Sequence, residues 1–325
     1  MVNNRTISLA NYSMNKFPRL DSPAMPDYLP SIMKNKISTN KTVAIIGFGL
    51  LGTSLGMALK GGKYIRVGWS RRPESRKQAL KNNVVDKVFE NPEDAVSNAD
   101  ITVICLPIPM IIEFCVKFAK FWKKGAIVTD IGSVKEKIVS AVSPVLGRNG
   151  VFFIGSHPMA GSEQSGAEAA EADLYEGAMV FLIPSLKTPA KVIKETADLW
   201  KSAGARILEI DSRKHDTIVA HTSHVPHILA TILTLTALGD GKTRLQRENG
   251  CAGGFRDTTR IASSAPQMWR EIIENNRDAV LRTLVEFERN LKSFRDNIRK
   301  AEYSKLEEKL QSAKDLRDSW ITRKK

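Results

Sequence analysis

A histidine that could transfer protons stands in the segment Ser156-His157-Pro158-Met159-Ala160-Gly161. The apolar run at 151–154 predicts a buried strand that opens into a loop at this point. Loops at strand ends line ligand clefts in α/β proteins, and the ordinary pKa of histidine suits general acid or base catalysis near neutrality. The alternative is a histidine that packs beside Pro158 and helps the chain to turn.

The other four of the five histidines lie close together, between His215 and His227. His221, His224 and His227 are spaced three apart, so on a helix they would lie near one another, and we expect Pro226 to distort that helix. No cysteine or acid stands at ligand spacing within 220–227, so we expect no metal. The alternative for each ring is core packing or a helix end.

Two arginines follow a glycine-rich bend in the segment 250–260. Arg256 and Arg260 are four residues apart and would share one face of a helix. Guanidinium groups can grip a carboxylate through two parallel hydrogen bonds, which predicts an anion site here. The alternative is that one of the two only pairs with Asp257.

A second constellation suits a dinucleotide. The β-rich run at 42–46 leads into Gly47-Phe48-Gly49-Leu50-Leu51-Gly52, and 54–60 has helix-forming composition. In this context the first glycine allows a tight turn, the second lets a pyrophosphate approach the backbone, and the third allows close helix packing. All six residues are therefore candidates for cofactor binding; the alternative is a glycine-rich turn without a ligand. The candidates are Gly47, Phe48, Gly49, Leu50, Leu51 and Gly52.

The next predicted strand, 64–69, is followed by Ser70, Arg71 and Arg72. NAD-binding enzymes of this kind usually carry an acid here, which binds the ribose hydroxyls. Without a carboxylate to repel it, a 2′-phosphate could accept hydrogen bonds from Ser70 and from the two arginines. The sequence therefore favours NADP, with NAD also accepted; the alternative is a solvated basic turn that tolerates either.

Further strand and helix segments must position these residues. A strand at 101–107, a helix at 109–122 and a strand at 125–130 follow in order, which predicts a parallel sheet with ligands beyond its carboxyl ends. Leu106, Pro107 and Ser133 would then line the same crevice as the glycine turn. Ser133 could instead be the N-cap of the helix that begins near 135.

The β pattern ends after the runs at 179–183 and 205–210, and the chain then reads as helix. An apolar stripe within 272–320 predicts a long amphipathic helix or a helix pair, which fits a dimer interface or a core. We therefore expect an α/β fold in which a Rossmann-type parallel sheet domain precedes an all-α substrate and dimerisation domain. The expected parts are a poorly ordered extension at 1–40, an NAD(P)-binding domain at 41–210 and a helical domain at 211–325.

Composition restricts the class of protein. The 325 residues carry a net charge of +14, but the basic residues are spread along the chain, which favours anionic small molecules over nucleic acid. The three cysteines show no CxxC spacing, as expected in a reducing cytoplasm. No stretch reaches 18 consecutive apolar residues, so we expect no membrane span. The extension at 1–40 is a disordered tail, a targeting peptide or the product of a start codon placed too far upstream.

With these motifs in view, the chain resembles the prephenate/arogenate dehydrogenase family of tyrosine biosynthesis. The glycine turn is generic, but the other five motifs together are highly specific. The resemblance runs from about residue 42 to the C-terminal helices. The motifs are GFGLLG (47–52), DIGSVK (130–135), SHPMAGSE (156–163), AHTSHVPH (220–227), FRDTTRIA (255–262) and SSAPQMW (263–269).

The resemblance implies an NAD(P)-dependent oxidative decarboxylation of prephenate. From the cysteine usage and the apolar stripe we expect a cytoplasmic homodimer that is joined through the helical domain. His157 matches the histidine that takes the proton of the ring hydroxyl, and Ser133 matches the serine that hydrogen-bonds this histidine. Arg260 matches the arginine that grips a substrate carboxylate. The other residues that match the substrate pocket are Ser223, His224, His227, Gly253 and Trp269.

Three alternatives stay open at this point. An arogenate or dual-specificity cyclohexadienyl dehydrogenase would act on the amino counterpart of prephenate. A β-hydroxyacid dehydrogenase would share the fold but rely on a catalytic lysine, for which nothing here matches in place of His157. A non-catalytic dinucleotide-binding protein would have no use for His157, Ser133 and Arg260 together.

Overall fold

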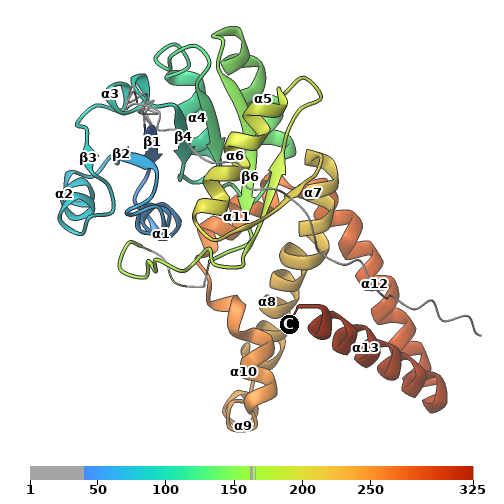
Figure 1. Cartoon of the computed structure of the whole chain (residues 1–325). Coiled ribbons are helices and arrows are strands. Elements are labelled where there is room, and N and C mark those ends of the chain that lie inside the picture. Colours follow the sequence, from blue (N-terminus) through green and yellow to red (C-terminus); the bar gives the residue numbers. More distant parts are fainter. Residues whose placement is uncertain (1–39, 162–163, 165, 325) are drawn as a thin grey trace, which may run out of the picture. The chain divides into compact units, whose positions relative to one another are not determined.

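The computed structural model describes residues 40–161, 164 and 166–324, and Figure 1 shows their arrangement. The predicted N-terminal extension, apart from its last residue, lies outside this range. Ser162 and Glu163, which end the SHPMAGSE motif, also lie outside the described residues.

The described strands form one sheet in the order β3-β2-β1-β4-β5-β6-β7-β8 (Figure 1). Neighbouring strands from β3 to β6 pair in parallel, as expected, whereas β7 runs antiparallel to β6, and β8 is parallel to β7. The sheet is therefore mostly parallel, with a reversal after the strand that carries His157. The strands are β1 (Lys41–Ile46), β2 (Tyr64–Trp69), β3 (Lys87–Val88), β4 (Ile101–Ile104), β5 (Ile127–Asp130), β6 (Phe152–Pro158), β7 (Met179–Ile183) and β8 (Arg206–Glu209).

Helices cover both faces of this sheet, so its central strands β4 and β5 are buried on both sides, whereas the edge strand β8 is mostly exposed. In β1, Val43 and Ile45 pack toward α1, α2 and α6, while Ala44 and Ile46 pack toward α3, α4 and α5. Burying each such branched side chain contributes about 1.5–3 kcal/mol, which makes β1 a firm support for the turn that follows it. The helices are α1 (Leu50–Ala58), α2 (Pro73–Lys81), α3 (Pro92–Ser97), α4 (Ile108–Lys117), α5 (Glu136–Arg148) and α6 (Ala190–Ser202).

The strand that carries His157 is longer than the predicted run at 151–154. Its pairing with β5 ends at Ile154, but β6 continues to Pro158 because its last residues pair with β7. His157 lies opposite Phe181 in this antiparallel ladder. His157 therefore stands at the end of its strand, as expected, one residue before β6 ends and beyond the last pair with the parallel neighbour.

From residue 212 on, the described chain is helical. The helices are α7 (Ser212–Val219), the π turn η1 (Ala220–His224), α8 (Val225–Leu238), α9 (Arg244–Asn249), α10 (Gly253–Thr259), the 3₁₀ turn η2 (Arg260–Ser263), α11 (Pro266–Asn275), α12 (Arg277–Arg299) and α13 (Tyr303–Lys324). The predicted helix pair of the C-terminal part corresponds to α12 and α13.

The expected distortion near Pro226 takes the form of the π turn η1. The N–H of Val225 bonds the carbonyl of Ala220, five residues earlier. Proline lacks an N–H and its ring clashes with the carbonyl four residues before it, and a wider turn relieves that clash. The helix Ser212–Leu238 is therefore continuous, and by length and composition alone it could cross a membrane, a test that core helices also pass.

Candidate active site

The glycine turn after β1 divides into positions that serve the fold and one that serves a ligand. Gly47 has φ +104°, and a Cβ there would lie 2.3 Å from the carbonyl oxygen of Cys105. A Cβ on Gly52 would lie 2.0 Å from the carbonyl oxygen of Gly47. A Cβ on Gly49 would meet nothing within 4 Å, although Gly49 directly precedes the N-terminus of α1. Gly49 thus leaves open space where helix N–H groups can bind phosphate.

A cleft of about 650 Å³ begins at this turn, a volume within the range of pockets for ligands of cofactor size. Its wall also includes Met110 and Phe114 of α4. Four predicted cofactor residues, Leu50, Leu51, Gly52 and Ser133, are not part of this lining. The predicted residues that line it are Gly47, Phe48, Gly49, Ser70, Arg71, Arg72, Leu106 and Pro107. The open turn, the helix N-terminus and the cations together fit a dinucleotide.

The basic end of the cleft has a hydrogen-bonded backbone and solvent-exposed side chains. Arg76 of α2 donates from Nη1 to the carbonyl of Ser70 at 2.6 Å, which holds the turn after β2. Arg71 and Arg72 are exposed and line the cleft, as does Lys117. Positions 70–72 carry no carboxylate, so a phosphate can approach these arginines directly.

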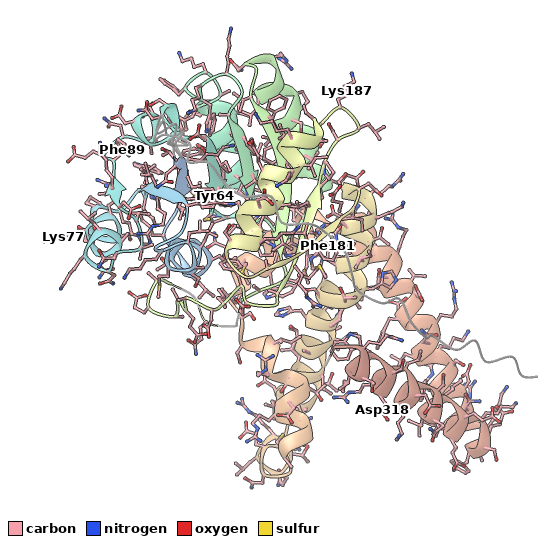
Figure 2. All side chains as sticks on the ribbon, viewed as in Figure 1. Tyr64, Lys77, Phe89, Phe181, Lys187 and Asp318 are labelled. Atoms are coloured by element: carbon pink, nitrogen blue, oxygen red, sulfur yellow. The ribbon has the colours of Figure 1, made fainter. Side chains whose placement is uncertain are left out.

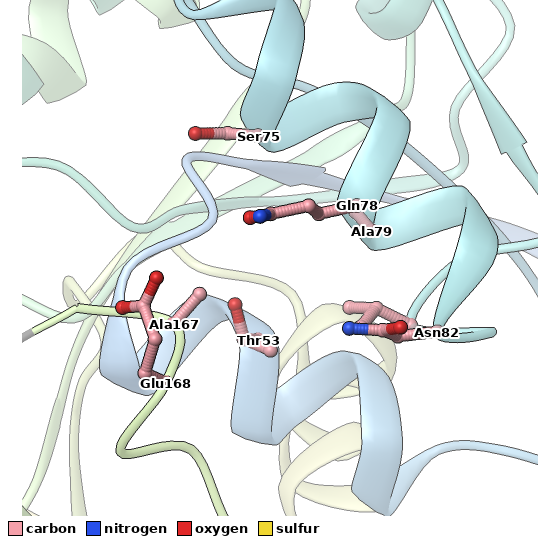
Figure 3. Close-up of a pocket in the computed structure, with 8 residues that line it drawn as sticks. Thr53, Ser75, Gln78, Ala79, Asn82, Ala167 and Glu168 are labelled. Carbon is pink, nitrogen blue, oxygen red and sulfur yellow. The ribbon is translucent and has the colours of Figure 1, made fainter.

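A smaller cavity of about 110 Å³ adjoins the cleft between α1 and α2, as Figure 3 shows. Ser75, Gln78, Ala167 and Glu168 line both spaces. Within the described chain, the buried hydroxyl of Thr53 at this cavity has no hydrogen-bond partner. The polar lining and the unpaired hydroxyl suit ordered water beside a bound cofactor.

A buried ion pair clamps the backbone just before His157. The ammonium group of Lys135 is fully buried, pairs with Asp130 and donates to the carbonyl of Ser156 at 2.8 Å. Asp130 accepts the N–H of Ser156 at 3.1 Å. Burial lowers the pKa of Lys135, and the carboxylate of Asp130 opposes that shift. The sequence did not point to a role for either residue, although both stand in the DIGSVK motif.

The ring of His157 is joined to the helical part of the chain. Its Nδ1 lies 2.9 Å from Nε2 of His215, whose Nδ1 lies 2.7 Å from Oδ1 of Asp216. His215 also packs edge-on against Phe181, which Figure 2 labels. Burial, and next the neighbouring His215, lower the pKa of His157 well below its ordinary value. His157 is therefore a neutral ring at neutral pH, as a general base must be.

Ser133 lies half-buried in the loop after β5. In the part of the chain that the structure describes, its hydroxyl forms no hydrogen bond with His157, so the predicted bond stays a prediction. The alternative role as the N-cap of α5 is wrong. The N–H groups of Lys135 and Glu136 at that helix end are bound instead by the carboxylate of Asp216, at 2.7 and 2.9 Å.

His224, His227 and Trp269 form an aromatic group beside this chain of rings. Trp269 stacks on His227 with centroids 3.6 Å apart and meets the edge of His224 at 6.1 Å. Across the described residues, three buried nitrogens of this group lack a partner: Nε2 of His224, Nδ1 of His227 and Nε1 of Trp269. Burial lowers the pKa of His224 to about 4, so this ring is neutral near pH 7.

Asn276 fixes which nitrogen of His224 carries its proton. The Nδ2 group of Asn276 donates to the carbonyl of Asp216 at 2.8 Å, which sets the orientation of the amide. The same Nδ2 lies 3.1 Å from Nδ1 of His224, which must therefore accept. A neutral His224 then carries its proton on Nε2. This nitrogen and Nε1 of Trp269 are two buried N–H donors that await an acceptor.

His221 does not join this group, contrary to the expectation from its spacing. It is exposed and lies 3.2 Å from Glu286 of α12, because the π turn changes the angular relation between His221 and the two later histidines. The described residues contain no group of three or more histidine, cysteine or acidic side chains that could hold a metal ion.

The arginine segment is exposed in the isolated chain. Arg256 pairs with Asp257 at 3.8 Å, both exposed, and thus fits the alternative given above. Arg260 opens η2, which packs against α8. Gly253 is the exposed first residue of α10, and Ser223 is half-buried in η1.

Two models of known families match the chain in sequence. The nucleotide-binding domain of prephenate dehydrogenase matches residues 55–209, and its dimerization domain matches residues 211–312. The chain belongs to the prephenate dehydrogenase family. The resemblance inferred from the six motifs is thereby confirmed.

Relatives in this family cover most of the chain. It is 35% identical over 263 residues to the cyclohexadienyl dehydrogenase of Zymomonas mobilis, covering 79% of this chain and 88% of that protein. It is 33% identical over 288 residues to the prephenate dehydrogenase of Bacillus subtilis, covering 87% and 77%.

A solved structure supports the same fold. Prephenate dehydrogenase from Aquifex aeolicus, crystallised with hydroxyphenyl propionate and NAD+, superimposes with a TM-score of 0.79 at 32% identity. The match covers 85% of this chain and 97% of that one. The predicted fold class is confirmed, and the chain is an oxidoreductase of the prephenate dehydrogenase family that uses a nicotinamide dinucleotide.

Proposed function

We propose that this chain converts prephenate to 4-hydroxyphenylpyruvate and carbon dioxide in tyrosine biosynthesis, with residues 41–210 as its NAD(P)-binding domain and 211–325 as its helical domain. The carrying observation is a neutral, buried His157 that is linked through His215, Asp216 and Asn276 to His224, one of a group of rings with unpaired N–H donors. A base beside donors suits a substrate that must lose a proton while its anionic and carbonyl oxygens are held.

In the proposed reaction His157 accepts the proton of the ring hydroxyl. A dinucleotide bound at the glycine turn supplies the acceptor for the hydride that leaves the carbinol carbon. The ring carboxylate departs as carbon dioxide and the ring becomes aromatic, which provides a large driving force. The protein therefore has to position the two reactants, remove one proton and hold two carboxylates.

The substrate contacts follow from the donors of the helical part. We assign Nε2–H of His224 and Nε1–H of Trp269 to substrate oxygens, and Arg260 to a carboxylate. Ser133 would support His157 on its cofactor side. The remaining predicted wall consists of Ser223, His227 and Gly253.

Prephenate and arogenate differ by a ketone against an ammonium group on the side chain. His224 and Trp269 are donors, which suit a ketone or carboxylate oxygen better than an ammonium. This difference favours prephenate, with an arogenate or dual-specificity activity as the second candidate. The relative from Z. mobilis bears the broader name of cyclohexadienyl dehydrogenase.

The cofactor preference is proposed to be NADP over NAD. Arg71 and Arg72 line the cleft, beside Ser70 and without a carboxylate at the same turn. A 2′-phosphate that meets one guanidinium gains a charge-assisted contact of about 1.5–3 kcal/mol.

We further propose a cytoplasmic homodimer joined through the helical domain. The matching family model names this region a dimerization domain. Large apolar side chains are exposed on its helices, as expected for a face that another copy covers. Examples on α8 and α12 are Ile232, Leu233, Leu235, Leu281, Val285 and Leu291.

Steady-state kinetics with both substrates and both cofactors test the proposal. We expect reduced-cofactor formation with prephenate to exceed that with arogenate, and kcat/KM for NADP to exceed that for NAD. Replacing Arg71 and Arg72 together by alanine should lower kcat/KM for NADP about 10- to 100-fold and leave the NAD value within about two-fold. No turnover with either substrate would contradict the proposed activity, and equal use of both cofactors by the parent protein would contradict the preference.

A further inference from the structure

We infer that His215 and Asp216 are positioning residues that hold the proton of His157 on Nδ1 and so keep the lone pair of Nε2 for the substrate proton. The inference rests on the proposed role of His157 as general base. It goes beyond that role because it assigns a hydrogen-bonded chain across the two parts of the molecule, Asp216 to His215 to His157.

The direction of the chain is set at Asp216. This residue is 3% exposed, and its two oxygens accept the backbone N–H groups of Lys135 and Glu136 at 2.7 and 2.9 Å. A carboxylate accepts hydrogen bonds and does not donate them. Nδ1 of His215, 2.7 Å from Oδ1, is therefore the donor in that contact.

The proton position on His215 in turn sets the proton position on His157. His215 is fully buried, and burial lowers its pKa, so at neutral pH the ring is neutral and has one N–H. With that proton on Nδ1, its Nε2 holds a lone pair, and Nδ1 of His157 at 2.9 Å must donate to it. A neutral His157 then has its one accepting lone pair on Nε2.

The chain also bears on the charge that forms during the reaction. When Nε2 of His157 takes a proton, His215, Lys135 and His224 oppose the positive ring, while Asp216 and Asp130 favour a positive charge on His215. The bond from Nδ1 of His157 through His215 connects that positive charge to the carboxylate of Asp216. Acids in serine hydrolase triads stabilise an imidazolium and its tautomer in the same way.

Without His215, either nitrogen of a neutral His157 could carry the proton. Molecules in which Nε2 of His157 carries the proton would have no lone pair on that nitrogen to take the substrate proton. Phenylalanine suits this position because His215 already packs against Phe181, and His215→Phe leaves the bonds from Asp216 to α5 in place. Asp216→Asn disturbs the end of α5 as well, so it serves as a second variant.

Nitrogen-15 NMR of histidine-labelled protein at neutral pH reads the tautomer without substrate. We expect His157 with its proton on Nδ1 and His224 with its proton on Nε2, the His157 signals being assigned by their loss in His157→Asn. In His215→Phe the Nδ1–H form of His157 should give way to a mixture of tautomers. A parent protein whose His157 carries its proton on Nε2 would overturn the inference.

Kinetics give an independent reading. His215→Phe should lower kcat by about 10- to 100-fold with KM for the substrate within about two-fold, and Asp216→Asn should change kcat in the same direction. His221→Phe is the matched control, because that exposed ring lies on the same helix but takes no part in the hydrogen bonds from Asp216 through His215 to His157. The kcat of this variant should not change. A normal kcat in His215→Phe would contradict the inference.

The two proposals fail separately. If the tautomer of His157 is as inferred but no cyclohexadienyl substrate reacts, the proposed function is wrong and the chain of rings remains. If prephenate is oxidised normally by both His215→Phe and Asp216→Asn, the function remains and the positioning role is wrong.

Discussion

A buried N–H without a partner costs a protein about 1–3 kcal/mol, and two such groups lie side by side in the helical part. Nε2 of His224 and Nε1 of Trp269 are unpaired among the described residues, in rings that meet edge to face. Asn276 directs the first of them, because its Nδ2 group donates to Nδ1 of His224 and so leaves the proton of that ring on Nε2. Such a cost is recovered when a ligand supplies the acceptor, which supports our proposal that substrate oxygens bind at this pair.

Trp269→Phe tests that assignment. The change removes the donor but keeps a ring to stack on His227, so KM for prephenate should rise about 10-fold or more while kcat stays within about three-fold. Trp122→Phe is the matched control, because Nε1 of Trp122 already donates to Thr102 at 2.9 Å in the core. The control should lose unfolding free energy and keep its KM; an unchanged KM in Trp269→Phe would place the substrate elsewhere.

The sequence indicated which side chains take part in the site but not which residues form hydrogen bonds with them. His157 and His224 were singled out from strand pattern, spacing and family resemblance. Asp216 and Asn276 were given no role, and His215 only a place in the histidine cluster. Their roles come from contacts with residues 52 to 81 positions away, which a local pattern does not reveal.

Among the elements, the turn from β1 to α1 separates stability from binding within six residues. Gly47 needs its positive φ and its close approach to Cys105, and Gly52 needs its close approach to Gly47. Gly49 has φ −85° and ψ −166°, extended values that any residue adopts, and has free space around it. The fold therefore requires glycine at Gly47 and Gly52, while only a ligand requires it at Gly49.

Gly49→Ala and Gly47→Ala should accordingly have different effects. Gly49→Ala should keep or raise the unfolding free energy, by up to about 1 kcal/mol, and raise KM for the cofactor about 10-fold or more, because its Cβ enters the phosphate site. Gly47→Ala should lower the unfolding free energy by more than about 1 kcal/mol. Urea titration measures the unfolding free energy, and cofactor kinetics measure KM. If the Gly49→Ala variant binds the cofactor normally, the cofactor phosphate does not bind at this turn.

The sequence predicted the strands β2 and β7 at their observed bounds, since β7 is a continuous apolar run and β2 is rich in β-branched and aromatic residues. It placed His157 at a strand end but did not indicate that Gly155 to Pro158 pair with β7, a strand from another part of the chain. It also predicted a distortion of the helix near Pro226, but not that the distortion would separate His221 from the two later histidines. The π turn η1 depends on Pro226 and on packing against α12, and this turn leaves His221 away from His224.

In the molecule as a whole, the described Rossmann-type and helical parts are joined by polar groups that must stay neutral or paired. Asp216 binds the end of α5, Asn276 binds Asp216, and His215 meets His157. The sequence indicated the two parts from the end of the β pattern near residue 210. It gave no sign that the acid of one part would cap a helix of the other, because that contact exists only in the folded chain.

This junction makes stability depend on pH. Burial lowers the pKa of His157, His215, His224 and His227 from the ordinary 6.5. Below pH 6.5 the unfolded chain therefore binds more protons than the folded one, so unfolding free energy falls as pH falls through this window. Carboxyl groups such as Asp86 and Asp100 have a pKa lowered from the ordinary 3.8. They therefore stay ionised in the folded state throughout this window.

We therefore expect the unfolding free energy to drop between pH 7 and pH 5, with His224 alone, at a pKa of about 4, contributing about 2 kcal/mol of the loss. Urea unfolding at both pH values measures the drop, and His224→Asn should reduce it by that amount. His221→Gln is the control: hydrogen bonds to Thr217 and Glu286 raise the pKa of that exposed ring, so its removal should leave the drop in full. Equal stability at pH 7 and pH 5 would mean that these rings are free to take protons in the folded state, and the neutral His157 on which the proposed base depends would be lost with them.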